Sequence, residues 1–301
     1  MSRRGERSMV PRAKFESYYG KPILKAPVWS AVDIGGYLFL GGLAGASSVL
    51  AAGAELTARP ALARATKFGA FTAIGASLVA LVHDLGKPAR FVNMLRVVKP
   101  TSPMSVGSWL LAGYGPAAGA AAVTAATGWF PRIGRAATFG ASALGPAVAA
   151  YTAVLLSDTA TPAWHGGYRE MPFVFVGSGA SAAAGLAMIA APTTETGPAR
   201  RAGLFGAAVE TAALRRMRTR LGMVAETHYE GKAGKLLKAA EVLTAAGAVT
   251  GFLLGRRNRT AAALSGAALL AGSACTRLGI FHAGVQSTQD PKYVVEPQRK
   301  A

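Results

Sequence analysis

The stretch "AVDIGGYLFLGGLAGASSVLAAGA", residues 31–54, decides the fold of this chain. It is apolar almost throughout, and its single charged residue, Asp33, lies close to its start. The hydrocarbon core of a bilayer is about 30 Å thick, which about 20 helical residues can cross. Lipid offers no hydrogen bonds to the backbone, so only helices and closed barrels cross it. We therefore predict a membrane-spanning helix here.

The composition of the whole chain extends this prediction. Of its 301 residues, 51% are hydrophobic, only 16% are charged and 37 are glycine. This is too apolar for an ordinary soluble domain, and small residues let membrane helices pack closely. The formal net charge is +19, but the basic residues lie almost entirely between the apolar runs. That distribution is typical of loops at a membrane surface and argues against nucleic-acid binding.

Seven further segments have the length and polarity of membrane helices, and alternating strand patterns are absent. The predicted fold class is therefore an all-α integral membrane protein, a bundle of eight transmembrane helices. The further segments cover residues 67–84, 104–127, 136–157, 172–191, 201–222, 238–254 and 260–285. The segment 201–222 carries Glu210 and several arginines, so we expect it either to be shielded by other helices or to lie partly at the membrane interface.

Eight spans place both termini on the same side of the membrane. We divide the chain into a polar, amphipathic N-terminal segment (1–28), an eight-helix membrane domain (29–285) and a polar C-terminal tail (286–301). More lysines and arginines fall on the side of the termini, which favours cytoplasmic termini. The residues after Arg3 and Arg4 are polar and interrupted by proline, so we expect no cleaved signal. The expected location is the cell membrane, with several spans.

Polar residues gather at one predicted membrane face. Charged groups in membrane helices cost roughly 2.5–3.5 kcal/mol, so each is expected to have a partner or a function. Antiparallel helices bring a set of such groups to the face that bears the termini: Asp33, His83, Asp84, Ser105, Trp109, Asp158, Arg277 and His282. We interpret them as a convergent polar site.

The segment "LVHDLGKPARFVNMLRVVKPTSPMSVGSW", residues 81–109, holds the most distinctive part of this site. His83 and Asp84 end a predicted helix, and one interpretation is a helix end that reaches water, capped by Gly86. An acid at a helix C-terminus opposes the helix dipole. We therefore expect Asp84 to have a cationic neighbour, either Lys87 or Arg90.

The sequence argues against a redox centre in this chain. One cysteine, Cys275, cannot hold an iron-sulfur cluster. A haem would need two histidines that face each other within the bundle, whereas His83 and His282 fall at helix ends. We expect no haem and no iron-sulfur cluster bound by this chain.

Several motifs along the chain resemble those of a known family. They are "SYYGKPILKAPVW", "DIGGYLFLGGLAGASS", "HDLGKPARFVNML", "SPMSVGSW", "YTAVLLSDTATPAWHG" and "TRLGIFHAGVQSTQDPKYVVEPQR". They resemble the membrane subunits of the NrfD, or polysulfide reductase, family in its actinobacterial form. The resemblance implies an eight-helix subunit without a catalytic centre of its own. It also implies a ferredoxin-like iron-sulfur partner, a molybdopterin oxidoreductase catalytic subunit, and electron exchange with a quinone, for which we expect menaquinone.

The resemblance also implies a quinone pocket near the face that meets the iron-sulfur protein. The candidates that it gives are Asp33, Tyr37, Ser105 and Trp109 for the pocket and His83 and Asp84 for proton exchange. Quinone chemistry moves two electrons and two protons, and an imidazole held by a carboxylate can trade protons near neutral pH. Lys87 and Arg90 are expected to dock the partner.

Two other functions remain open from the sequence. A proton- or ion-conducting subunit or transporter would need charges from face to face, which Glu55, Glu210 and Glu241 could help to provide. The second is a structural anchor without a quinone site.

Overall fold

The computed structural model of the chain describes residues 23–87 and 89–300, and every regular element in that part is helical. The predicted all-α class is confirmed. The long helices are α1 (Ala31–Leu56), α2 (Pro60–Asp84), α4 (Pro103–Thr127), α5 (Pro131–Ser157), α7 (Met171–Ala190), α8 (Gly197–Leu221), α9 (Gly231–Leu254) and α10 (Arg259–Gln289). The short ones are α3 (Ala89–Met94), α6 (Pro162–Gly166), the 3-10 helix η1 (Gly222–His228) and α11 (Lys292–Lys300).

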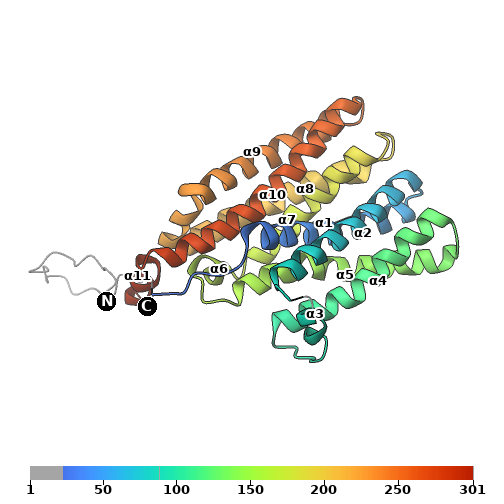
Figure 1. Cartoon of the computed structure of the whole chain (residues 1–301). Helices are drawn as coiled ribbons and strands as arrows, with labels where there is room; N and C mark the ends of the chain where they lie inside the picture. Colours follow the sequence, from blue (N-terminus) through green and yellow to red (C-terminus); the bar gives the residue numbers. More distant parts are fainter. Residues whose placement is uncertain (1–22, 88, 301) are drawn as a thin grey trace, which may run out of the picture.

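The long helices form one elongated bundle of antiparallel hairpins (Figure 1). Short connections join α1 to α2, α4 to α5, α7 to α8 and α9 to α10, and all four lie at one end of the bundle, which we call the hairpin end. The opposite end carries residues 23–30 together with α3, α6, η1 and α11, and we call it the terminal end. The chain therefore enters and leaves the bundle at the same end.

Six of the eight long helices are long and apolar enough to cross a membrane: α1, α2, α5, α7, α9 and α10. α4 has no charged side chain, but its Gly, Ser, Pro, Trp and Tyr residues lower its mean hydropathy. α8 carries Glu210 and several arginines. The described part of the chain thus contains the predicted eight long helices. Six of these have the length and composition of membrane-spanning helices.

Several predicted helix boundaries are wrong. α5 begins at Pro131 rather than at residue 136, and α9 begins at Gly231 rather than at residue 238. α2 begins at Pro60 rather than at residue 67, because the Lys67 ammonium pairs with the Glu55 carboxylate of α1 and so lies inside the helix. α10 continues past residue 285 to Gln289. The predicted tail, 286–301, includes the end of α10 and the short helix α11, whereas most of the predicted N-terminal segment, 1–28, lies outside the described residues.

Pairs of glycines set the distance between the central helices. Gly45 of α1 faces Gly145 of α5, and a Cβ atom on either glycine would collide with the backbone of the other. The same holds for Gly185 of α7 and Gly266 of α10. Such close backbone contact is how small residues hold membrane helices together.

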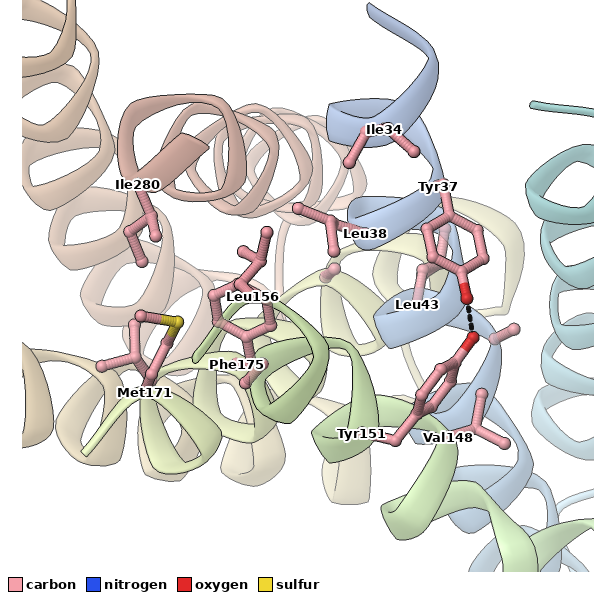
Figure 2. Close-up of a cluster of buried hydrophobic side chains, with 14 of the residues drawn as sticks. Ile34, Tyr37, Leu38, Leu43, Val148, Tyr151, Leu156, Met171, Phe175 and Ile280 are labelled. Atoms are coloured by element: carbon pink, nitrogen blue, oxygen red, sulfur yellow. Dashed lines mark hydrogen bonds between the residues drawn. The ribbon is translucent and has the colours of Figure 1, made fainter. Parts of the chain in front are cut away.

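The largest buried cluster lies where α1, α5, α7 and α10 meet (Figure 2). Leu38, Leu156, Phe175 and Ile280 converge there and are almost completely buried. This cluster fixes the terminal-end halves of α1 and α5 relative to each other, and both helices contribute residues to the site described next.

Candidate functional site

A narrow cavity lies between α1, α2, α3, α4 and α5 at the terminal end of the bundle. Its polar contributors are Trp29, Tyr37, Asp84, Ser108 and Tyr151, and its other lining residues are apolar or glycine. Its volume is about 80 Å³, below the about 300–1,000 Å³ typical of small-molecule sites. A flat ligand would therefore have to displace side chains at the entrance.

Two tyrosine hydroxyls meet at the inner wall of this cavity. Tyr37 of α1 and Tyr151 of α5 are hydrogen-bonded through their hydroxyl groups, and their rings pack edge to face with centroids 6.4 Å apart (Figure 2). Both side chains are buried. Each hydroxyl can both donate and accept a hydrogen bond, so the pair can turn a donor toward a ligand without leaving an acceptor unpaired.

Asp84 lines the cavity from the end of α2. One carboxylate oxygen, Oδ1, accepts a hydrogen bond from the Ser30 backbone N–H at 3.0 Å. Ser30 is the N-cap of α1, so the acid at the C-terminus of α2 lies against the positive end of the neighbouring antiparallel helix. The expected cationic neighbour of Asp84 is thus replaced by a helix N-terminus, and the described part of the chain shows no ion pair to Asp84 from Lys87 or Arg90.

His83 does not pair with Asp84. Its Nδ1 lies 3.1 Å from Oδ2 of Asp33, and its side chain is 77% exposed. Successive residues at a helix end point in different directions, which is why Asp84 faces the cavity while His83 faces Asp33 and water. The His83–Asp33 pair lies outside the cavity lining, on the solvent side of the same helix ends.

Ser105 and Trp109 lie outside the cavity and hold the connection from α3 to α4. Ser105 Oγ donates to the Val97 carbonyl at 2.9 Å and accepts from the Lys99 N–H at 3.0 Å. Trp109 Nε1 donates to the same carbonyl of Val97 at 3.2 Å, and its side chain is 44% exposed. The polar residue that α4 gives to the cavity is instead Ser108.

Lys87 and Arg90 are exposed at the terminal end. Arg90 Nη1 donates to the Leu85 carbonyl at 3.1 Å and so covers the C-terminus of α2. Neither side chain lines the cavity, and their predicted role in docking stays a prediction.

The sequence interpretation missed Tyr151 and Ser108. Tyr151 lies seven residues before Asp158, which was placed at the terminal face, so two helical turns separate it from that face. Tyr37 lies at a similar depth in α1, seven residues after Ser30. The sequence therefore predicts that Tyr37 and Tyr151 lie at the same depth in their helices. It does not predict that α1 and α5 are in contact.

The cavity can place a flat, mostly apolar molecule against one carboxylate and two hydroxyls. Phe91, Met94 and Met104 form part of its lining from α3 and the start of α4. α3 has no buried residue, so these side chains can move at low cost. Apolar walls with a few polar groups at one end are typical of sites for small organic ligands.

Comparison with known proteins identifies the part of the chain that holds most of this site. No curated protein matches the chain. Residues 23–130 match the family model described as polysulphide reductase, NrfD. The match covers α1 to α4 and therefore Tyr37, Asp84 and Ser108, while Tyr151 lies beyond it. Over residues 23–130 the chain is therefore similar to the NrfD polysulphide reductase family, the family that its motifs predicted.

Proposed function

We propose that this protein is the quinone-interacting membrane subunit of an oxidoreductase complex. In this role it passes electrons between the quinone pool, which we take to be menaquinone, and a ferredoxin-like iron-sulfur partner linked to a molybdopterin catalytic subunit. The observation that carries the proposal is the apolar cavity lined by Tyr37, Tyr151 and Asp84, which lies largely within the part that matches the NrfD family.

The residues present fit a quinone headgroup. A quinone, when bound, supplies an exchange of two electrons and two protons at its two carbonyl oxygens. The hydroxyl pair of Tyr37 and Tyr151 can donate a hydrogen bond to one such oxygen from the buried end of the cavity. Asp84 can accept a proton, because Oδ2 has no hydrogen-bond partner among the described residues, whereas Oδ1 is held by Ser30. Apolar walls surround both groups.

His83 and Asp33 serve proton exchange with water in this proposal. The Asp33 carboxylate holds one nitrogen of the exposed imidazole, and the ring can trade protons with the solvent. Asp84 neighbours His83 in sequence, so the carboxylate that faces the cavity and the imidazole that faces water share one helix end. In this proposal Asp84 exchanges protons with the quinone, and His83 exchanges protons with water.

The electron partner docks at the terminal end in this proposal. Lys87 and Arg90 are exposed there, beside the cavity-lining residues Leu85 and Phe91. This chain contributes one cysteine, so the redox centres belong to its partners. We further propose that all eight long helices span the cell membrane and that both termini face the cytoplasm.

The test is oxidation of a menaquinol analogue by the assembled complex. Asp84→Asn removes the proton acceptor, and Tyr151→Phe removes one hydroxyl from the pair. General acid–base groups contribute about 10²–10⁴-fold, so we expect turnover of Asp84→Asn to fall at least about a hundredfold. His83→Ala should shift the pH profile of turnover, because it removes the exchange with water.

Asp158→Asn is the matched control, since Asp158 is an exposed acid at the same end and lies outside the cavity. Unchanged turnover and unchanged quinone affinity in both Asp84→Asn and Tyr151→Phe would remove the proposed site. Loss of activity in Asp158→Asn alone would place the function elsewhere at this end.

A second candidate, proton or ion conduction, rests on buried charges in the other half of the bundle. Glu210 of α8 and Arg277 of α10 are both buried, and Glu210 accepts a hydrogen bond from Thr276. The other predicted members of a path are paired: Glu55 with Lys67, and Glu241 with Arg218 at 2.5 Å. Glu210→Gln in proteoliposomes tests this function, because conduction predicts a loss of proton flux with quinone turnover otherwise retained.

A further inference from the structure

A second cavity lies at the hairpin end of the bundle, far from the quinone site along the helices. It opens between the α1–α2 connection and the ends of α4 and α5, and its volume is about 660 Å³. Four of its lining residues are basic, Arg59, Arg64, Lys67 and Arg135, and one is acidic, Glu55. The proposed function uses none of these residues.

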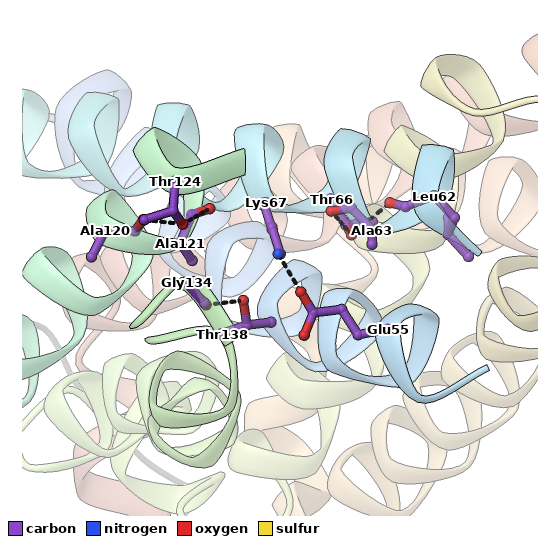
Figure 3. A network of polar contacts seen from close by, with 10 residues as sticks. All are labelled: Glu55, Leu62, Ala63, Thr66, Lys67, Ala120, Ala121, Thr124, Gly134 and Thr138. Carbon is purple, nitrogen blue, oxygen red and sulfur yellow. Dashed lines mark hydrogen bonds and ion pairs between the residues drawn. The ribbon is translucent and has the colours of Figure 1, made fainter. Parts of the chain in front are cut away.

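The acid in this cavity is already neutralised. The Lys67 ammonium reaches across from α2 to the Glu55 carboxylate of α1, and Lys67 is buried (Figure 3). Burial of a charge is costly unless the charge is paired, so we expect the ion pair between Lys67 and Glu55 to persist. The charge that faces the open part of the cavity is therefore that of the arginines.

The three arginines have no acidic partner among the residues that the structure describes. Within the described part of the chain, no carboxylate lies within ion-pair distance of Arg59, Arg64 or Arg135. Arg59 donates to the Thr57 carbonyl at 3.3 Å, and the Arg64 guanidinium lies over the Phe68 ring at 5.8 Å. Guanidinium groups that share one cavity and form no ion pair with a carboxylate match the oxygens of a phosphate, which they bind with paired hydrogen bonds.

Neighbouring aromatic residues place this cavity at the depth of lipid headgroups. Trp129 and Phe130, in the connection from α4 to α5, are 70% and 66% exposed. Exposed aromatic residues at helix ends mark the membrane interface. Phe71 of α2 and Val123 of α4 are exposed and lie closer to the middle of the bundle than Arg64 and Ala125. An acyl chain attached to the phosphate would lie there.

We propose that this cavity binds the phosphate of an anionic phospholipid headgroup, with Arg64 and Arg135 as its principal contacts from α2 and α5. Basic pockets between membrane helices are a recognised way to hold such headgroups. The bound lipid would bridge the two hairpins α1–α2 and α4–α5, whose opposite ends enclose the quinone cavity. The proposal goes beyond the quinone function and does not depend on it.

The experiment measures phosphatidylglycerol binding to the full chain, purified in a neutral detergent, by native mass spectrometry. Each arginine near a membrane surface contributes about fivefold to the binding of an anionic lipid. We therefore expect Arg64→Gln with Arg135→Gln to weaken binding by about twentyfold or more. The charge-keeping pair Arg64→Lys with Arg135→Lys should lose much less, which separates lost charge from altered folding.

Arg132→Gln is the matched control, because Arg132 is exposed on α5 three residues before Arg135 and lies outside the cavity. Equal phosphatidylglycerol binding by the double glutamine variant and this control would overturn the site. Equally tight binding of inorganic phosphate, with the same dependence on Arg64 and Arg135, would overturn the assignment to a lipid. Neither result would alter quinone turnover, so the two proposals fail separately.

Discussion

The position of the Tyr151 ring depends on a glycine that faces it from α4. A Cβ atom at Gly107 would collide with the ring of Tyr151, so Gly107→Ala is expected to push Tyr151 away from Tyr37. Forcing a methyl group into a packed site costs about 1–3 kcal/mol, and one lost hydrogen bond adds about 1 kcal/mol. We expect a menaquinone analogue to bind about tenfold or more weakly.

To check this prediction, binding of the analogue to the purified protein is measured by the quenching of the protein's intrinsic fluorescence. The control is Gly115→Ala on the same helix, because a Cβ atom there would meet nothing within 4 Å. Equal weakening in both variants would indicate a general effect on α4 rather than on Tyr151.

Burial of His228 in η1 makes the stability of the fold depend on pH. Burial, helped by the nearby Arg218 guanidinium, lowers the pKa of His228 to about 3, and its Nδ1 has no hydrogen-bond partner in the described part of the chain. The unfolded chain takes up a proton on His228 below about pH 6.5, whereas the folded chain does not until about pH 3. Stability is therefore lost as the pH falls through this range, by about 2 kcal/mol at pH 5.

His228→Gln should abolish this part of the acid sensitivity. We expect the thermal unfolding midpoint in detergent to fall less between pH 7.5 and pH 5 in the variant than in the parent protein. His165→Gln, at an exposed histidine of α6, should leave the parent's pH dependence unchanged. A variant of His228 with the same acid sensitivity as the parent would contradict the assignment.

The site could be predicted in part from the sequence. Asp84 was a candidate because polar residues near the ends of apolar segments fall at one membrane face, and Tyr37 was a candidate because the family resemblance implied it. The partners of these residues could not be predicted. Asp84 is held by the Ser30 N–H, a backbone group without a sequence signal, and the Tyr37–Tyr151 contact joins helices far apart in the chain.

At the scale of elements, the short helix α3 controls entry to the narrow cavity. Met94 lines the cavity, while no residue of α3 is buried. Met94→Trp adds bulk at the entrance without disturbing a core. We expect KM for a menaquinol analogue to rise about tenfold, since overpacking costs about 1–3 kcal/mol, with little change in kcat.

Steady-state kinetics of the assembled complex measure both constants. Val92→Trp is the control, because Val92 is exposed on the same helix and outside the cavity. A fall in kcat at constant KM for Met94→Trp would mean that α3 affects a step after binding.

The long helices could be predicted from apolar length alone, but their ends and the short helices could not. Lys67 was taken for a helix boundary, although its pairing with Glu55 lets it lie inside α2. α8 is similar: Arg218 pairs with Glu241 of α9, and Arg220 binds Glu170, the N-cap of α7. Charges that neighbouring helices neutralise cannot be recognised from one segment at a time.

At the scale of the whole molecule, these pairs bear on whether α4 and α8 cross the membrane with the other six helices. The partners of Glu210, Arg218 and Arg220 lie on α10, on α9 and at the N-cap of α7, so these three charges on α8 are paired with protein groups. Pairing of this kind lowers the cost of placing α8 within the bilayer. Eight crossings also account for the position of the four hairpin connections at one end of the bundle (Figure 1).

Single cysteines on both sides of the two helices in question measure these crossings. In a background of Cys275→Ala, which removes the single native cysteine, a membrane-impermeant maleimide is applied to sealed vesicles of known orientation. We expect Thr101→Cys and Glu230→Cys to react from one side of the membrane, because both positions lie at the terminal end of the bundle. Trp129→Cys and Thr194→Cys should react from the other side, because both lie at the hairpin end. If α8 instead lies along the interface, Thr194→Cys and Glu230→Cys will react from the same side. The chain after α8 would then be inverted, and its two termini would face opposite sides of the membrane.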